Sequence, residues 1–522
     1  MIFNNVNTKS LKRKNINGDN GKEKVAKQKF SLTNSLSKNI NLFKSIFSND
    51  DTIRFREFQN SKDCSIKFCI IFYDGLVNNG IIDEFIIKPL ILSENMKNDE
   101  SLIDIVMNQF IHSNRVQKLN DMNKIIESVT YGETLLILEN TNYILTIDTK
   151  GFVLRGITEP DAEKILYGPR EGFSEGIMIN LSLIRRRLRT NELKMKFKTL
   201  GESSRTAICI CYMENIVKDY IIEEIEKRLD KIRVDGVLDT NYVTEYIRDA
   251  KYSPFPTIGC TERPDNVVGK LLEGRVALFM DGTPMVITLP YLFIENFQSS
   301  EDYYMDPFYN TISRILRMIS FLMTITIPSF FISVISFHPE MLPAPLMINI
   351  ASERKILPLP AALEAFAMLA IFDILRETGV RMPSSIGQAL SIVGALVIGQ
   401  AAVAAKLVSA PMIIVVAITG ITSLVIPKIN SSIVVTRFFL LAMSSLMGFY
   451  GLVCGLMVTL IHVLNLKTFG IPQFMPDCKI DLQNFKDVLI RKPLLKMFKR
   501  QKYLTENITR LEIVDTKENV NE

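Results

Sequence analysis

The apolar positions divide this chain into two parts with different patterns. Between residues 51 and 305, apolar runs of strand length alternate with amphipathic helical patterns, which is typical of α/β structure. Beyond residue 305 the runs are much longer, and Met318–Phe337 alone holds 20 residues without a charge. Such a stretch can cross a hydrocarbon layer of about 30 Å. We therefore predict an α+β/α-helical membrane protein, with two small cytoplasmic α/β subdomains followed by a helical transmembrane domain. The predicted boundaries are a disordered basic tail at 1–50, subdomains at 51–155 and 156–305, the transmembrane domain at 306–467 and a cytoplasmic C-terminal tail at 468–522.

The first subdomain is defined by three runs rich in β-branched and aromatic residues, Cys64–Tyr73, Glu133–Leu138 and Tyr143–Asp148. The last two flank Asn140-Thr-Asn and predict a hairpin. A helical pattern covers Ile103–Phe110. No Gly-rich phosphate loop follows any of these runs, so they give no support to nucleotide chemistry.

The second subdomain contains two motifs rich in charge, proline and glycine. The first, YGPREGFSE, precedes a helix that carries three consecutive arginines. Consecutive residues point in different directions around a helix, so we expect ion pairs between domains or subunits rather than one anion site. The second motif, CTERPD (Cys260–Asp265), precedes another helix and a hairpin that turns at Asp281-Gly282. The other predicted elements are a strand at Thr206–Tyr212 and helices at Val217–Ile232, Thr240–Asp249 and Asn266–Glu273.

Four spans are predicted in the transmembrane domain, at Met318–Phe337, Ser384–Ala405, Pro411–Ile426 and Phe438–Leu464. A further apolar stretch, Leu357–Leu375, contains two prolines and two acidic residues, and we expect an interfacial or re-entrant helix there. The basic C-terminal tail is expected in the cytoplasm. An even number of spans then places the N-terminal part on the same side.

One span carries features that a simple anchor does not need. Within Ser384–Ala405, small residues recur at every fourth position from Gly387 to Gly399, which lets helix backbones approach closely. Gln388 and Gln400 place amides at membrane depth, where they need partners or water. The helix is therefore either buried among other helices or faces a water path, and both interpretations stay open.

The distribution of charges and cysteines gives no support to nucleic-acid binding, secretion or metal binding. Residues 1–50 hold 10 Lys/Arg against 3 Asp/Glu, which predicts a disordered tail. A tail that is simply solvated is the favoured interpretation; of the two partners a basic tail could bind, anionic lipid is favoured over nucleic acid. The N-terminus lacks the apolar segment of a signal peptide, so we expect the large N-terminal part to stay in the cytoplasm. The seven cysteines lack the spacing of a zinc site and predict reduced thiols, without metal or other cofactors.

No enzymatic site is predicted. Cys260 could be taken for a nucleophile, but the whole chain has only three histidines and none lies near it in the sequence. Glu364 and Asp373 would lie on opposite sides of a continuous helix, so they do not suit an acid–base pair. We expect helix capping and ion pairs from both.

A resemblance to the A subunit of the GerA-type spore germinant receptors rests on five stretches. They are YGPREGF, IRRRL, SPFPTIGCTERPDNVVGKLLEGRVALFMDGTPMVITLP, RETGVRMPSSIGQALSIVGALVIGQAAV and KLVSAPMIIVVAITGITSLVIP. The resemblance covers residues 55–500 approximately, and the basic first 50 residues lie outside it. Where the family usually has a second acidic residue after GPREGF, this chain has Ser174-Glu175-Gly176, so no role is carried over to an acidic pair there.

The resemblance implies a receptor subunit in the inner membrane of a dormant spore, embedded in lipid and without a nucleic-acid partner. It implies two partners, a transporter-like B subunit that holds the nutrient site and a lipoprotein C subunit. It also implies a homo-oligomeric ring that opens as a cation channel when nutrient binds. The alternative is a membrane solute transporter component with Leu357–Leu375 as its binding element, which the lack of an inverted hydropathy repeat disfavours.

A ring of this kind would need a pore face and a subunit interface. One narrow helix face holds a single bulky apolar residue, Ile392, that could block ions by dewetting. The residues of this face are Gln388, Ile392, Ala395 and Gly399. The alternative pore face is a stripe of hydroxyls at Thr326, Ser329, Ser333 and Ser336. Subunit contacts are predicted between arginines of one copy and carboxylates of the next. The candidates are Arg185, Arg186, Arg187, Glu171 and Glu175.

Overall fold

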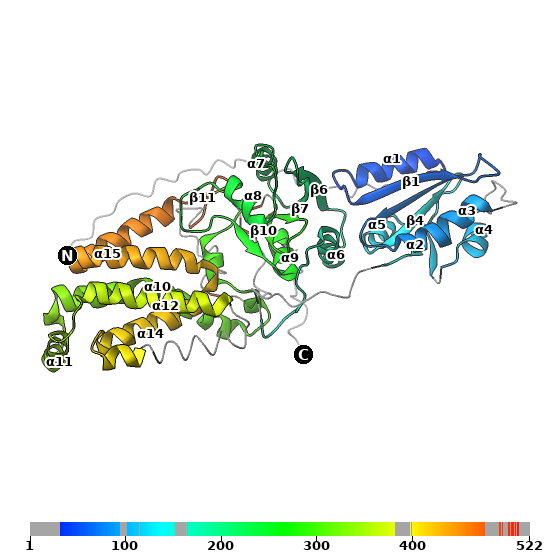
Figure 1. Cartoon of the computed structure of the whole chain (residues 1–522). Coiled ribbons are helices and arrows are strands. Elements are labelled where there is room, and N and C mark those ends of the chain that lie inside the picture. Colours follow the sequence, from blue (N-terminus) through cyan, green and yellow to red (C-terminus); the bar gives the residue numbers. More distant parts are fainter. Residues whose placement is uncertain are drawn as a thin grey trace, which may run out of the picture.

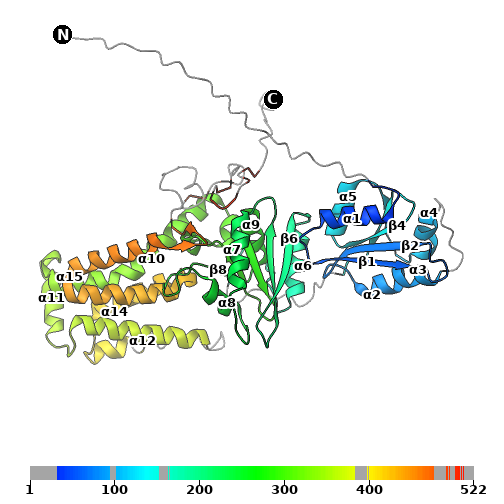
Figure 2. The same ribbon diagram turned by 90° about the horizontal axis from the view of Figure 1, so that it is seen from above.

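The computed structural model describes residues 32–93, 102–113, 115–151, 163, 165–381, 397, 399–474, 490, 491, 493, 500, 501, 503–505, 507, 509 and 510. Three units follow one another along the molecule, two sheet-containing subdomains and a bundle of long helices (Figures 1 and 2). The second subdomain lies between the first subdomain and the bundle. It is therefore the unit through which the other two are connected.

The first subdomain is built on a five-stranded antiparallel sheet with strand order β1-β2-β4-β5-β3. Side chains alternate between its faces: Phe68 and Ile70 belong to one apolar cluster, Cys69 and Ile71 to the other. The strands are β1 (Ile53–Gln59), β2 (Lys67–Tyr73), β3 (Val116–Leu119), β4 (Glu133–Leu138) and β5 (Ile144–Asp148). One face is covered by α1 (Leu36–Ile46) and α5 (Met122–Thr130). The other is covered by α2 (Asn79–Ile82), η1 (Asp83–Ile87), α3 (Lys88–Leu92), α4 (Leu102–Ile105) and η2 (Val106–Phe110).

Helix α1 corrects the prediction that residues 1–50 form one disordered tail. Its apolar residues Leu36, Ile40 and Phe43 recur with helical spacing and are buried against the sheet. Lys38 and Lys44 lie on its exposed side. The average composition of the first 50 residues hid this short amphipathic pattern.

The second subdomain is a second five-stranded antiparallel sheet, with strand order β6-β7-β9-β10-β8. Its strands are β6 (Leu193–Leu200), β7 (Thr206–Met213), β8 (Gly259–Thr261), β9 (Val276–Met280) and β10 (Val286–Leu289). Helices α6 (Ile177–Arg187) and α9 (Pro264–Leu272) cover one face. Helices α7 (Asp219–Leu229) and α8 (Thr240–Ile247) cover the other. The strands, helices and hairpins that the sequence predicted in both subdomains are confirmed in kind, with boundaries shifted by a few residues.

The two subdomains share one topology. Each runs helix, two strands, a helical segment, one strand, one helix and a closing hairpin, and the two sheets have the same strand order. Equivalent turns agree in detail, since Gly132 before β4 and Gly274 before β9 have φ values of 93° and 91°. After β2 and after β7 the chain makes the same turn, which ends in one bridging residue, Val77 or Val217. The chain thus contains an internal structural repeat.

The third unit is the helical bundle. Two stretches, Pro307–Phe337 and Pro427–Asn465, are long and apolar enough to cross a membrane by length and composition, and Ala410–Leu424 is a shorter apolar helix. The long α10 packs along α12, α14 and α15. The helices described are α10 (Pro307–Phe337), η5 (Pro339–Met341), α11 (Ala344–Arg354), α12 (Ala361–Arg381), α14 (Ala410–Leu424), η6 (Pro427–Ile429) and α15 (Asn430–Asn465).

Helix α15 is folded back on itself, which corrects the prediction of one span at Phe438–Leu464. Gly448 has φ 60° and ψ −137°, far from helical values, and reverses the chain. A β-carbon on Gly451 would lie 2.1 Å from the carbonyl oxygen of Met443, so the two legs touch closely. The legs lie side by side in Figures 1 and 2. The GxxxG spacing of Gly451 and Gly455 therefore packs two halves of one hairpin within a single chain.

Both ends of this hairpin return to the second subdomain. The hydroxyl of Ser432 donates to the carbonyl of Pro254 at 2.6 Å. Past the other end, β11 (Lys467–Thr468) pairs with β12 (Ile471–Pro472), and Thr468 donates to the carbonyl of Thr257 at 2.9 Å.

Helix α12 carries acidic residues whose partners lie inside the bundle. Glu364 accepts hydrogen bonds from the backbone and hydroxyl of Ser409 at 2.6 and 2.7 Å, and so caps the start of α14. Asp373 pairs with Arg437 of α15 at 2.5 Å. These are the cap and the ion pair expected from the sequence. Helix α12 also packs along α10 and α14, so most of the apolar stretch Leu357–Leu375 is an integral part of the bundle.

Candidate functional site

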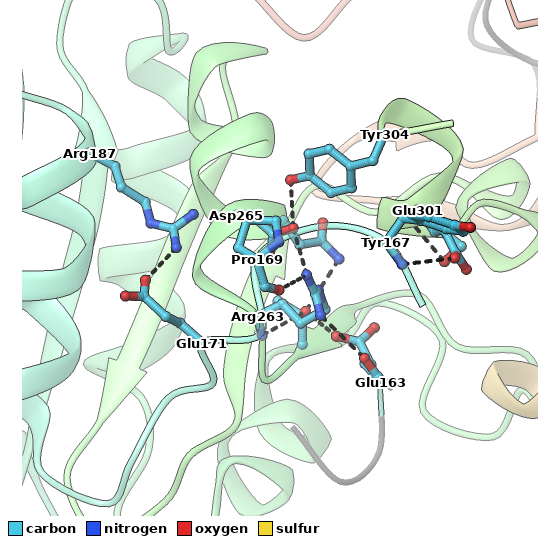
Figure 3. Close-up of polar contacts among 12 residues, drawn as sticks. Glu163, Tyr167, Pro169, Glu171, Arg187, Arg263, Asp265, Glu301 and Tyr304 are labelled. Atoms are coloured by element: carbon cyan, nitrogen blue, oxygen red, sulfur yellow. Dashed lines mark hydrogen bonds and ion pairs between the residues drawn. The ribbon is translucent and has the colours of Figure 1, made fainter. Parts of the chain in front are cut away.

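The two charged motifs of the second subdomain meet beside Glu301 and Tyr304, in the segment that leads into α10 (Figure 3). The loop that contains YGPREGF runs beside the loop that contains CTERPD. The backbone N–H of Phe173 donates to the carbonyl of Glu262 at 2.9 Å, and the guanidinium of Arg263 donates to the carbonyl of Pro169 at 2.8 Å. These two hydrogen bonds hold the two loops together although they are about 90 residues apart in the sequence.

Arg263 is the centre of this contact. Its side chain is only 1% exposed, and it donates to Asp265 at 2.8 Å as well as to the carbonyls of Pro169 and Glu163. It occupies the N-cap of α9, immediately before Pro264 at the first helical turn. A buried guanidinium needs such a set of acceptors, because its desolvation is otherwise costly.

The motif loops are tied to the segment that leads into α10. The hydroxyl of Tyr304 donates to Asp265 at 2.7 Å, and the backbone N–H groups of Leu166 and Tyr167 both donate to Glu301 at 3.2 Å. Burial, and then the hydrogen bond to Asp265, raise the pKa of Tyr304, so the phenol stays protonated as a donor. Glu301 belongs to η4 (Ser300–Tyr303), which follows η3 (Phe293–Phe297).

Asp302 fixes the first turns of α10. Arg317 pairs with it at 2.8 Å and Arg314 at 3.0 Å, while the amide of Asn310 donates to its backbone carbonyl at 2.7 Å. Burial by itself would raise the pKa of Asp302, but the hydrogen bond and charge of Arg317, followed by those of Arg314, outweigh it and lower the pKa. The carboxylate is therefore held ionised between two helix residues.

A second connection reaches η6, between α14 and α15. Lys428 pairs with Glu163 at 3.3 Å, and Glu163 in turn accepts from the hydroxyl of Thr261. Together these contacts join the motif loops to two separate points of the bundle. We call this set the junction cluster; it consists of Glu163, Pro169, Thr261, Arg263, Asp265, Glu301, Asp302, Tyr304, Arg314, Arg317 and Lys428.

A cavity of about 520 Å³ lies beside the junction cluster. Asp265, Tyr304 and Lys428 line it together with Lys270, Arg275 and Glu295. Glu295 pairs with Arg275 and, at 3.2 Å, with Lys270. Burial, which the charge of Glu295 opposes, lowers the pKa of Lys270. Among the described residues, no group of three or more His, Cys, Asp or Glu is placed to hold a metal ion.

Arg185 is not available for contact between subunits, which corrects its prediction as an interface residue. Its side chain is 2% exposed, pairs with Asp50 at 2.7 Å and stacks 4.2 Å from the ring of Tyr73. Because Asp50 and Tyr73 belong to the first subdomain, this arginine joins the two subdomains. The expectation of an ion pair between domains is confirmed at this position.

Arg186 and Arg187 find a carboxylate in their own chain. Both pair with Glu171 at 2.5 Å, and the two remain about one-fifth exposed. Burial opposes ionisation of Glu171, but hydrogen bonds from Arg187 and Arg186 lower its pKa overall. Glu175 is exposed and has no ion pair among the described residues. A role for these residues between subunits stays a prediction.

The preferred pore face falls mostly outside the described residues. Gln388, Ile392 and Ala395 lie outside them, whereas Gly399 is buried, with Ile413 of α14 within 4 Å of the place its β-carbon would take. The residues of the alternative pore face differ in their exposure. Ser329 and Ser333 are buried, Thr326 is half-buried and Ser336 is exposed.

The two buried hydroxyls face another helix of the same bundle. Ser333 and Ser444 of α15 share a hydrogen bond of 2.9 Å, and Ser444 also donates to the carbonyl of Ser329 at 2.6 Å. The hydroxyl of Ser333 and the backbone carbonyl of Ser329 are thus used in holding α10 against α15. Both side chains are buried inside the bundle, which corrects the prediction that Ser329 and Ser333 line a pore.

Sequence reasoning identified both motifs but singled out no residue that organises the second. It weighed Cys260 as a nucleophile, whereas Arg263, Asp265 and Tyr304 form the contacts that organise the site. An arginine placed directly before the Pro-Asp start of a helix was the available signal, since an ordinary N-cap would carry a side-chain acceptor.

The chain was then compared with known proteins. A family model described as Bacillus/Clostridium GerA spore germination protein matches residues 41–503. Spore germination protein KA of Bacillus subtilis (strain 168) is 37% identical over 464 residues, covering 88% of this chain and 85% of that protein. Spore germination protein B1 of the same strain is 33% identical over 471 residues, covering 90% and 97%.

A solved structure was also found. The crystal structure of the N-terminal domain of the A subunit of the Bacillus megaterium spore germinant receptor GerK3 is 32% identical. It covers 51% of this chain and 98% of that chain, with a TM-score of 0.41. The family match starts at residue 41, inside α1, and so begins earlier than the resemblance drawn from the motifs.

Proposed function

Because the chain belongs to the GerA family of spore germination proteins and is a germinant receptor A subunit, we propose that it forms a nutrient-gated cation channel. In this proposal, copies of the chain assemble into a ring in the inner membrane of the spore. A transporter-like B subunit would bind the nutrient, and a lipoprotein C subunit would complete the receptor. The helical bundle would surround the ion path, and the two subdomains would transmit the signal.

The observation that carries the proposal is the junction cluster. A gated channel needs a connection through which a change in a soluble part alters the packing of membrane helices. Here the motif loops are joined to α10 through Asp302 and to η6 through Lys428. A shift of the second subdomain would therefore act on two helices at once.

The proposed orientation places both termini on the spore-core side. Helix α10 begins at the second subdomain, and both ends of the α15 hairpin return to it. The basic residues near the C-terminus agree with this orientation. Labelling of a cysteine introduced at Lys499 from the outer face should then fail, and efficient labelling there would contradict the orientation.

For the ion path we retain the face of Gln388, Ile392, Ala395 and Gly399, with Ile392 as the hydrophobic constriction. The use of Ser333 inside the bundle supports this choice over the hydroxyl stripe. An Ile392→Ala variant should leak ions without nutrient. Ser333→Ala should not, and a silent Ile392→Ala variant in a normally assembled complex would place the constriction elsewhere.

The decisive experiment measures nutrient-dependent cation flux in liposomes that contain the full chain with its B and C subunits. Lys428→Gln, which removes the contact with Glu163, should reduce the flux without reducing assembly. The matched control is Lys118→Gln, which removes an ion pair with Asp104 of similar length, 2.9 Å, in the first subdomain. Flux of a transported solute without ion conductance would instead favour the alternative, a solute transporter component. A catalytic role is not part of the proposal.

A further inference from the structure

The internal repeat allows the same groove to be compared in two places. In the first subdomain, the residues after β2 form a groove that the chain closes with the residues directly after β5. Val77 bridges Lys150, the backbone N–H of Asn78 donates to the carbonyl of Thr149 at 2.8 Å, and that of Gly151 donates to the carbonyl of Leu76 at 3.0 Å. The first subdomain thus closes its own groove.

In the second subdomain, the residues directly after β10 do not close the equivalent groove after β7. After β10 it continues through Pro290 into η3, where the N–H of Phe293 donates to the carbonyl of Gln473. The equivalent groove is occupied instead by residues from the far end of the chain. Val217 bridges Thr505, whose hydroxyl donates to the carbonyl of Ile216 at 2.5 Å.

The described residues of this C-terminal segment fit the groove closely. Leu504 is fully buried in the apolar cluster of the second subdomain, and Thr505 is 1% exposed. The carbonyl of Leu504 lies so near Gly274 that a β-carbon there would come within 2.9 Å of it. Arg500 donates to the carbonyl of Leu272 at 2.6 Å.

The same segment also forms part of the wall of the cavity beside the junction cluster. Arg500, Gln501 and Arg510 line that cavity, and Arg510 pairs with Glu273 at its edge. Displacing the segment would therefore both open the groove and enlarge the cavity next to Asp265 and Lys428.

We propose that residues 503–505 are a detachable strand of the second subdomain, and that their release is a step in the response of the receptor. The segment is attached by one bridging residue, one buried leucine and side-chain contacts, so it can be released without breaking a hydrogen-bond ladder. The first subdomain cannot do this, since Lys150 follows β5 directly. The claim that release is a step in the response rests on the proposed function. The claim that residues 503–505 dock in the groove does not, and it is tested separately.

Docking is tested by the labelling rate of Leu504→Cys with a maleimide in the full chain. The buried position should react slowly, and adding Gly274→Ala should accelerate labelling by about tenfold or more, because the new β-carbon displaces the segment. Gly132→Ala is the matched control, since it introduces a side chain at the same positive φ in the subdomain that closes itself. Rapid labelling without Gly274→Ala, or equal effects of both alanines, would overturn the docking.

Release is tested by locking. Val217→Cys with Thr505→Cys places two thiols at bridged positions, where a disulfide can form within one chain. Oxidation should reduce nutrient-triggered ion release from spores by about tenfold or more, and reduction should restore it. The control lock, Val77→Cys with Lys150→Cys, should leave the response unchanged. A normal response from the locked chain, beside a responsive wild type, would overturn release; an unresponsive wild type would instead count against the proposed function.

Discussion

The two subdomains share a topology but differ in what completes them. The first is closed by its own residues, and its ion pairs are mostly on the surface, as in Arg56 with Asp83 and Lys118 with Asp104. The second borrows residues from the end of the chain and keeps charges in its interior, including Arg263, Asp302 and Glu295. The difference shows that the same fold forms a self-contained unit in the first subdomain and connects other parts of the chain in the second.

The largest effect should come from position 263. Arg263→Ala would leave Asp265 with its charge buried and its main cation lost, which we expect to cost about 3–5 kcal/mol of unfolding free energy. The equivalent N-cap in the first subdomain is Asp121, which accepts from the backbone of Asn123. Asp121→Ala should cost only about 1 kcal/mol. Urea unfolding of the purified chains measures both, and equal losses would contradict the proposed difference between the copies.

The next effect concerns the joint between the subdomains. Arg185→Met leaves Asp50 buried without its cation, so we expect a loss of about 3 kcal/mol. Asp50→Asn added to Arg185→Met should recover part of the loss, because no charge is then left unpaired. The matched comparison is Arg186→Met on the same helix. A loss as large for Arg186 as for Arg185 would refute the assignment of Arg185 as the joint.

A smaller effect is expected from pH. The pKa of Asp302 is lowered in the folded chain, so its contribution is present above its unfolded value near 3.8 and is lost as the pH falls through the lower folded value. The thermal unfolding temperature should therefore fall as the pH is lowered below about 4. Asp302→Asn should remove that pH dependence while lowering stability at neutral pH. An unchanged acid profile in this variant would show that other groups are responsible.

The smallest effect on stability is expected for Arg186→Glu. The side chain is partly exposed, and pairs of this kind contribute about 0–1 kcal/mol. The variant still tests the predicted role between subunits. Fewer cross-linked oligomers in membranes, with stability unchanged, would support that role. Undiminished oligomers would leave the pair with Glu171 as its whole function.

Local patterns were enough to predict most elements of the second subdomain and the three central strands of the first, β2, β4 and β5. The hairpin at Asp281-Gly282 follows from turn chemistry, which acts over a few residues. The edge strands β1, β3, β6 and β8 were missed. Of these, β3 and β8 hold only four and three residues, which carry too little periodicity.

The site was harder to predict, because its partners are far apart in sequence. The tie from Arg263 to Pro169, and that from Glu163 to Lys428, depend on how the subdomain meets the bundle. The reversal at Gly448 was hidden for another reason. An unbroken apolar run gives no polar turn signal, and one glycine among several does not identify itself as the turn.

The closing of the second groove by Leu504 and Thr505 has a consequence for how the protein is made. The first subdomain can fold as soon as its own residues have left the ribosome. In the second, the groove stays unfilled until residues arrive that are translated more than 200 positions after β10, on the order of ten seconds or more later at ordinary synthesis rates. During that interval the helices of the bundle are themselves being translated. A prematurely terminated product would therefore leave exposed the apolar residues of the second subdomain that pack on Leu504, as a product of full length does only after release of the segment.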